Sequence, residues 1–272
     1  MSPRGRGFTL AELLVAIVLA ALVGQTMVRL VTVSQRLFRA QSERAGLQAT
    51  VRAGAMLLPA ELRELSGEDL LAIAPDQLVY RAMRLTAVAC RISATAVTLR
   101  RRLTYAYRSL SPGRDTLLVF AASGSGPEND RWLTVALTGP ASAAVCPDGD
   151  AAVEWPAVVP LAAVSAAEGI PVRGFEVMQL RLYASTGQYW IGSRSVSGGE
   201  AQVQPAIGPL ASNGLEFGFR RLDGTTTTSA AEVAFVDLTV RGQTDGAVAG
   251  GGGTIAVGAD SVVAGVELRN AE

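Results

Sequence analysis

The chain has 272 residues, of which 49% are hydrophobic, and its 24 basic and 24 acidic side chains cancel to a formal net charge of zero. This length suits one well-buried domain or two small ones, and the balanced charge lacks the basic excess that binds nucleic acid. Histidine is absent and every basic residue is an arginine, which excludes a serine–histidine triad, histidine metal ligands, Schiff-base lysines and the P-loop lysine. We therefore expect no enzyme, no cofactor and no nucleic-acid partner.

The N-terminus joins a short positive segment to a long apolar one. Residues 2–7 read SPRGRG, and residues 8–28 read FTLAELLVAIVLAALVGQTMV, with Glu12 as the only charge. At 1.5 Å rise per residue, a helix of this length covers the roughly 30 Å of a hydrocarbon core. Because Arg4 and Arg6 precede the apolar stretch, the positive-inside rule predicts a cytoplasmic N-terminus, with the bulk of the chain beyond the membrane.

A cleavable secretory signal is one alternative for this segment. The small residues Ala20, Ala21 and Gly24 leave that option open. The apolar stretch is longer than the 7 to 15 residues usual in such signals, however, and no A-x-A site precedes an obvious mature start.

Glu12 stands where a carboxylate is costly. Deep in a membrane and unpaired, it costs roughly 2.5 to 3.5 kcal/mol, so a functional partner is the first hypothesis. Its place in the first turn lowers this cost, because the residue is near the interface and the positive end of the helix dipole favours it. A lone acid that reaches the headgroups is the alternative.

The string GFTLAE at residues 7–12, followed by an unbroken apolar run, resembles the type III signal sequence of type IV prepilins and type II secretion pseudopilins. The resemblance implies a prepilin peptidase that cuts between Gly7 and Phe8 and methylates the new N-terminus at Phe8. Glu12, then the fifth residue, would neutralise the amine of a neighbouring subunit in the filament core and set the axial register. Many pilins have a helix-kinking proline in this stretch; its absence here fits a pseudopilin or minor pilin.

The following segment, residues 28–65, is helical and amphipathic in pattern. Apolar residues recur mostly at spacings of three and four: Leu30, Val33, Leu37, Leu47, Val51, Leu58, Leu62 and Leu65. We expect the stripe of the outer half to dock on a globular part. Pro59, which lacks a backbone donor, predicts an end or kink near Leu58, then a short piece through Leu65 that closes at Ser66-Gly67.

Beyond residue 75 the chain has the alternation of an antiparallel β domain. The alternating triplets are Leu103, Tyr105 and Tyr107; Met178, Leu180 and Leu182; and Leu215, Phe217 and Phe219. Thr186-Gly187 and Asp223-Gly224 are typical of hairpin turns. Residues 123–130, 146–150 and 246–253 are expected to be loops.

The two cysteines, Cys90 and Cys146, are too few for a disulfide framework. They could form one disulfide in an oxidising compartment or remain two buried thiols, and the sequence leaves both options open.

Acidic and basic clusters also have two interpretations each. Asp148 and Asp150, or Glu128 and Asp130, could bind calcium, although acidic turns are commonly just solvated. The run Arg100–Arg102 could contact DNA, or it could be a charged strand edge that discourages aggregation.

The sequence therefore predicts an α+β protein: a leader at residues 1–7, a transmembrane and stalk helix at 8–65 and a β-rich periplasmic head at 66–272. LEFGFRRLDG from residue 215, the strand at 233–240 and the closing VAGVELRN are similar in order to the C-terminal hairpin and last strand of J-type minor pseudopilins and PilW-like minor pilins. A head this large favours a filament tip over a repeating shaft.

The resemblance implies the inner membrane and other minor and major pilins or pseudopilins as partners. The alternatives are a signal-anchored periplasmic binding module that never assembles and a DNA-uptake pilin.

Overall fold

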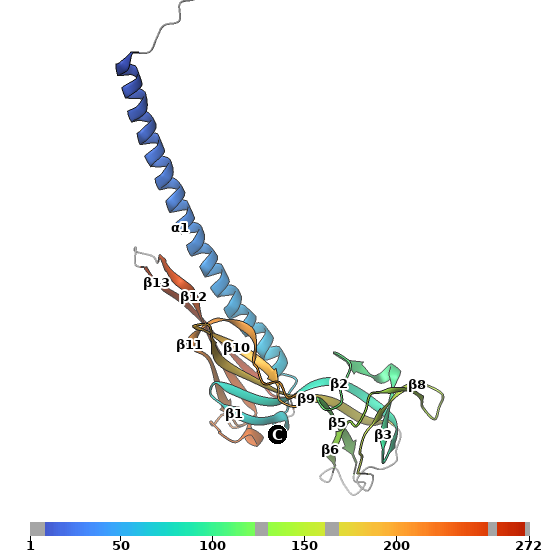
Figure 1. The fold of residues 1–272 in the computed structure, drawn as a ribbon. Helices are drawn as coiled ribbons and strands as arrows, with labels where there is room; N and C mark the ends of the chain where they lie inside the picture. The colour runs from blue at the N-terminus through green and yellow to red at the C-terminus, as the bar shows by residue number, and fades with distance from the viewer. Residues whose placement is uncertain (1–8, 123–129, 161–168, 250–254, 270–272) are drawn as a thin grey trace, which may run out of the picture.

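The computed structural model describes residues 9–122, 130–160, 169–249 and 255–269, and these form one long helix and an antiparallel β head (Figure 1). The helix, α1, runs without interruption over Leu10–Leu62. Most of its length projects beyond the head, which it meets only at its C-terminal end (Figure 1). The predicted α+β class, with a long N-terminal helix before an antiparallel β head, is confirmed.

The strands belong to one extended antiparallel sheet. They are β1 (Leu70–Ala74), β2 (Gln77–Ser93), β3 (Ala96–Arg100), β4 (Tyr105–Ala106), β5 (Asp115–Ala121), β6 (Arg131–Ala136), β7 (Ser142–Val145), β8 (Ala151–Pro156), β9 (Ile170–Ser185), β10 (Gln188–Ser195), β11 (Gln204–Arg220), β12 (Phe235–Ala249) and β13 (Ile255–Glu267). The main order is β13-β12-β11-β10-β9-β2-β3-β8-β7, while β1 and β4 pair with β2, β5 with β9, and β6 with β5. Short 3₁₀ turns are η1 (Gly67–Asp69), η2 (Arg101–Leu103) and η5 (Ala230–Glu232).

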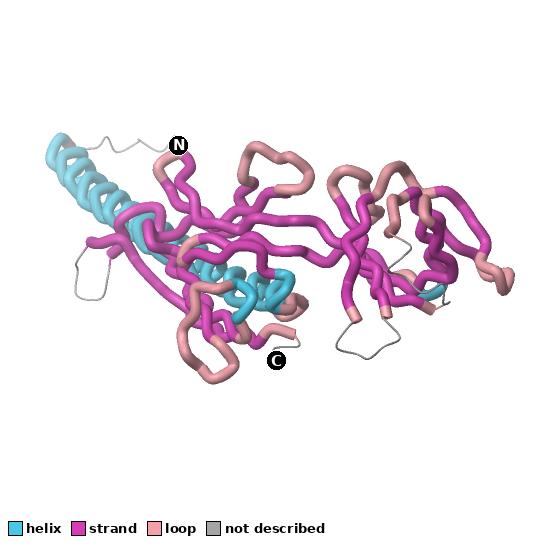
Figure 2. Tube along the Cα trace, turned by 90° about the horizontal axis from the view of Figure 1, so that it is seen from below, coloured by secondary structure: helices cyan, strands magenta, loops and turns pink. Residues whose placement is uncertain are grey.

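Two of these strands run through the whole head. β2 and β9 pair with each other from Gln77↔Arg181 to Ala89↔Ile170. One half of this ribbon is flanked by β1 and β10, and the other half by β3 and β5. The head therefore has two lobes on one ribbon (Figures 1 and 2). Each lobe has its own buried core. We call the lobe that holds β1 and β10–β13 the proximal lobe and the lobe that holds β3–β8 the distal lobe.

The proximal lobe holds the end of the helix. The buried residues of α1 are Leu47, Val51, Gly54, Leu58, Pro59 and Leu62. They lie against β11, β12 and β13. A Cβ on Gly242 of β12 would lie 2.6 Å from Leu47 Cδ1 and 2.8 Å from Val51 Cγ2, so the helix approaches the strand too closely for a side chain there. The predicted docking of the apolar stripe's outer half is confirmed.

The helix continues through Pro59 to Leu62, so the predicted end near Leu58 is wrong, while a kink there stays a prediction. Pro59 lies inside the last turns of α1, and its carbonyl accepts the Arg63 N–H at 3.0 Å. Although Pro59 cannot donate one helical hydrogen bond, Leu58 and Leu62 are both buried in the proximal core. Tertiary packing therefore maintains the final turn.

The distal lobe nearly closes on itself. The end of β6 meets the end of β8 through an isolated bridge between Leu137 and Ala157, and the Thr138 N–H donates to Pro156 O at 2.9 Å. Strands β6, β5, β9, β2, β3 and β8 thus surround the second core, which includes Val97, Val119 and Val172.

The two predicted hairpin turns have different outcomes, and two of the predicted strands are confirmed. Thr186 and Gly187 have φ of 52° and 82° and join β9 to β10, which confirms that hairpin. Gly224 also lies in a turn, but residues 221–234 separate β11 from β12, so Asp223-Gly224 does not join these two strands directly. The strands with Met178 and with Phe217 are confirmed as β9 and β11.

Two strand boundaries differ from expectation. Leu103 lies in a 3₁₀ turn and Tyr105 in a two-residue strand, because their alternation has no buried face: both side chains are exposed. Residues 246–249 continue β12 instead of forming a loop, since they pair with β13. Of the other expected loops, 146–150 links β7 to β8. Residues 123–129 and 250–254 lie outside the described residues.

Substituting Gly242→Val tests the close contact between helix and sheet. We expect the free energy of unfolding of the full chain in detergent to fall by about 1 to 3 kcal/mol, because the new side chain overlaps Leu47 and Val51. Gly246→Val is the control, since a Cβ at Gly246 meets nothing within 4 Å. Urea denaturation gives both values, and equal stability of the two variants would contradict the close packing.

Candidate functional site

The N-terminus of α1 carries a reciprocal hydrogen-bond pair. Thr9 is the N-cap: the Glu12 N–H donates to Thr9 Oγ1 at 3.3 Å, and the Thr9 N–H donates to Glu12 Oε2 at 2.9 Å. This capping box fixes the Glu12 carboxylate in the first turn, at the positive end of the helix. The T-x-x-E spacing of Thr9 and Glu12 is the local sequence signal for this cap. Gly7 and Phe8 lie outside the described residues.

The N-terminal half of α1 contacts nothing else in the described chain. Its large apolar side chains are each half or more exposed: Leu10, Leu13, Leu14, Val15, Ile17, Val18, Leu19, Leu22, Val23, Met27, Val28, Leu30, Val31, Val33, Leu37 and Phe38. By length and composition this helix can cross a membrane. A helix that is apolar on all sides needs lipid or other helices around it.

The helix leaves the head near Glu43, whose carboxylate accepts the Asp245 N–H of β12 at 3.1 Å. Leu30, Val33 and Leu37 of the predicted stripe are exposed, whereas Leu47 is buried. An exposed section of α1 therefore separates the head from the transmembrane stretch. Residues 29–42 make this spacer about 20 Å long.

A buried cluster of charges lies where the two lobes meet. Glu176 of β9 and Asp115 of β5 have side chains that are 1% and 0% exposed, and their backbones pair directly. Arg84 Nε and Arg108 Nη2 donate to Glu176 Oε2 at 3.0 and 2.8 Å, and Arg114 bonds the other oxygen. Arg108 also forms a two-pronged pair with Asp115 at 2.6 and 2.7 Å. Three guanidinium groups thus enclose two carboxylates.

This cluster ties the lobes and the helix together. Arg84 on β2 extends the network to Glu61 in the last turn of α1, at 3.8 Å. Burial alone would raise the pKa of Glu176, but hydrogen bonds from the Ser195 hydroxyl and the three guanidinium groups outweigh it and hold the pKa at about 2. Glu176 is therefore ionised at neutral pH and unsuited to general acid–base chemistry. No local sequence pattern indicates this cluster, because its members come from separate strands and from the segment between β4 and β5.

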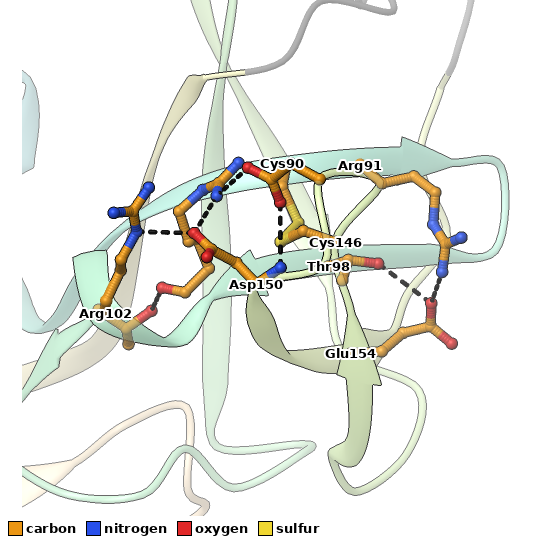
Figure 3. The surroundings of a disulfide bond; sticks show 10 residues. Cys90, Arg91, Thr98, Arg102, Cys146, Asp150 and Glu154 are labelled. Atoms are coloured by element: carbon orange, nitrogen blue, oxygen red, sulfur yellow. Dashed lines mark hydrogen bonds and ion pairs between the residues drawn. A yellow bond between two sulfur atoms is a disulfide. The ribbon is translucent and has the colours of Figure 1, made fainter.

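Cys90 of β2 and Cys146 of the β7–β8 loop form a disulfide, with their Cα atoms 5.7 Å apart (Figure 3). It joins one end of the long ribbon to the far edge of the distal lobe.

The loop after Cys146 carries the acidic pair for which calcium was considered. Asp148 and Asp150 both bond Arg100, and Arg102 Nε lies 2.7 Å from Asp150 (Figure 3). The hydrogen bond from Arg100 lowers the pKa of Asp148. Arginines therefore already neutralise these carboxylates. Of the other acidic pair, Glu128 lies outside the described residues.

The run Arg100–Arg102 is therefore not a charged strand edge. Arg100 ends β3 and is buried, Arg101 and Arg102 lie in η2, and two of the three side chains pair with the loop acids.

A comparison with protein-family models finds the prokaryotic N-terminal methylation motif at residues 3–24. The match spans Gly7, Phe8 and Glu12 together with most of the apolar stretch. No curated protein and no solved structure matches the chain.

Replacing Glu176 tests the charge cluster. Because its pKa is depressed from 4.5 to about 2, its contribution of ~3 kcal/mol is complete above pH ~4.5 and is lost as pH falls through 2. We expect Glu176→Gln to lower the free energy of unfolding at pH 7 by about 3 to 5 kcal/mol, since three partly exposed guanidinium groups lose the buried counter-charge that they share. The loss should shrink toward pH 2.

Urea denaturation of the full chain in detergent at pH 7, 4.5 and 3 measures this. The control is Glu216→Gln, which removes an exposed pair with Arg241 and should cost no more than about 1 kcal/mol. If the two variants lose equal stability at pH 7, the cluster does not hold the lobes together.

Proposed function

We propose that this chain, which its methylation motif and its apolar N-terminal helix mark as a type IV pilin-like or pseudopilin subunit, is a minor subunit that assembles at the tip of a filament. The observation that carries the proposal is the N-terminal half of α1, which is apolar on all sides and has no partner within the described chain. Lipid covers it before assembly, and the helices of neighbouring subunits cover it afterwards.

Processing would prepare the helix for this exchange. A prepilin peptidase cuts between Gly7 and Phe8 and methylates the new amine of Phe8. The motif match spans both residues and supports this step. The amine of an incoming subunit then pairs with Glu12 of its neighbour, which removes two charges that would be costly in an apolar core.

The charges before the helix and the disulfide in the head both support one orientation in the membrane. Arg4 and Arg6 hold the N-terminus in the cytoplasm, so the head lies in the periplasm. The Cys90–Cys146 disulfide is the kind of bond that persists in that oxidising compartment.

The shape of the head supports a tip position, and the order of the C-terminal strands β11, β12 and β13 is what supports a J-type or PilW-like subtype. The distal lobe extends to the side of the helix axis, beyond the proximal lobe (Figure 1). A repeating shaft subunit would have to accommodate this lobe at every step, whereas a terminal subunit has open space on one side.

Two substitutions in the capping box separate charge from helix capping. Glu12→Gln keeps an N3 side chain that can complete a capping box but removes the negative charge. Thr9→Ala removes the cap and keeps the charge. We expect Glu12→Gln to lower recovery in sheared filaments at least about tenfold, because the neighbour's amine loses its counter-charge, while Thr9→Ala assembles.

The measurement is the ratio of the protein in the filament fraction to that in the membrane fraction, in cells that express the other subunits. Glu43→Gln, on the same helix but beside the head, is the matched control and should assemble normally. Normal assembly of Glu12→Gln would overturn the role of this carboxylate, and absence of the native chain from filaments would overturn the function.

A further inference from the structure

Three arginines converge on a cleft of about 280 Å³ in the head. Arg63 comes from just after α1, Arg173 from β9 and Arg269 from just after β13. The cleft lies beside the β2–β4 pairing, and Tyr105 and Tyr107 form part of its wall. Its members are thus brought together only by the fold.

These arginines differ from most others in the head because they lack acidic partners. Arg84, Arg108 and Arg114 share Glu176, whereas within the described residues no ion pair involves Arg63, Arg173 or Arg269. Burial of Arg173, followed by the charge of nearby Arg269, lowers the pKa of Arg173, and the opposing effect of Asp69 is smaller. Like charges are therefore gathered at this place.

The Arg173 side chain is held in position without an acid. Its guanidinium lies over the Trp132 ring, 4.8 Å from the ring centroid, so a cation–π contact orients it. The single carboxylate in the cleft wall, Glu64, accepts a hydrogen bond from the Tyr107 hydroxyl at 2.9 Å. Among the described residues that line the cleft, three are arginines and one is a carboxylate, so this lining carries a positive net charge.

The rim has the composition of a protein-binding surface. Tyr105 and Tyr107 pack edge to face with centroids 5.5 Å apart, yet are 67% and 60% exposed. Tyrosine and arginine are the residue types that concentrate binding energy in protein interfaces. A cleft of this volume accommodates one or two side chains, so it suits a short segment of a partner.

We propose that this cleft binds a carboxylate side chain of an acidic peptide segment on a partner protein. The planar guanidinium groups donate to the carboxylate in pairs, and the exposed tyrosine rings pack on the apolar stem of the acidic residue. The site goes beyond filament assembly through α1, and it can exist whether or not the chain enters a filament.

A binding experiment with the full chain in a zwitterionic detergent tests this site. The probe is a fluorescein-labelled, N-acetylated tetraglutamate peptide, followed by fluorescence anisotropy at low salt. The double variant Arg63→Gln/Arg269→Gln should bind at least about tenfold more weakly, since two charge-assisted contacts are lost. Arg181→Gln, an exposed arginine on the same strand as Arg173, should bind as the native chain does.

Both variants replace exposed side chains, and an unchanged melting temperature would show that the fold is retained. Competition with inorganic phosphate distinguishes the class of ligand: the peptide should remain bound at phosphate concentrations equal to its own. Equal affinity of the double variant and the control would overturn the site. Displacement of the peptide by equimolar phosphate would overturn the preference for an acidic peptide.

Discussion

Within the part of the chain that the structure describes, the long helix buries only its C-terminal turns, and this constraint shapes the rest of the molecule. From Leu47 onward α1 packs on the proximal sheet, while the apolar side chains from Leu10 to Phe38 remain exposed. At about 25 cal/mol per Å² of apolar surface, leaving such a helix in water is strongly unfavourable. The fold is therefore complete only when lipid or other helices cover this segment.

In the head, two kinds of contact attach the distal lobe to the proximal lobe. A shared β2–β9 ribbon gives covalent and hydrogen-bonded continuity. The buried pair of Glu176 and Asp115, enclosed by three arginines, then fixes the point where the ribbon passes between lobes. Because Arg84 also contacts Glu61, the end of the helix is connected to the same point.

How much the sequence revealed depended on whether the signal was local. The apolar run, the T-x-x-E cap and the Thr186-Gly187 turn are encoded within a few residues, and the corresponding helix and hairpin could be predicted. The division into two lobes, the partners of Glu176 and the pairing of Arg100 with the loop acids arise from residues far apart in the chain. The predicted helix end near Leu58 was wrong because the hydrogen bond that Pro59 loses is offset by the burial of Leu58 and Leu62. The alternation around Tyr105 predicted a longer strand than the two residues that form, because alternation alone does not give a strand a buried face.

We propose that this helix enters a filament after the leader is removed. Intact-mass spectrometry of the protein purified from cells with and without their prepilin peptidase tests it most directly. We expect a chain that begins at N-methylated Phe8 only when the peptidase is present. A chain that retains residues 1–7 in both strains would contradict it and leave a membrane-anchored protein that does not assemble.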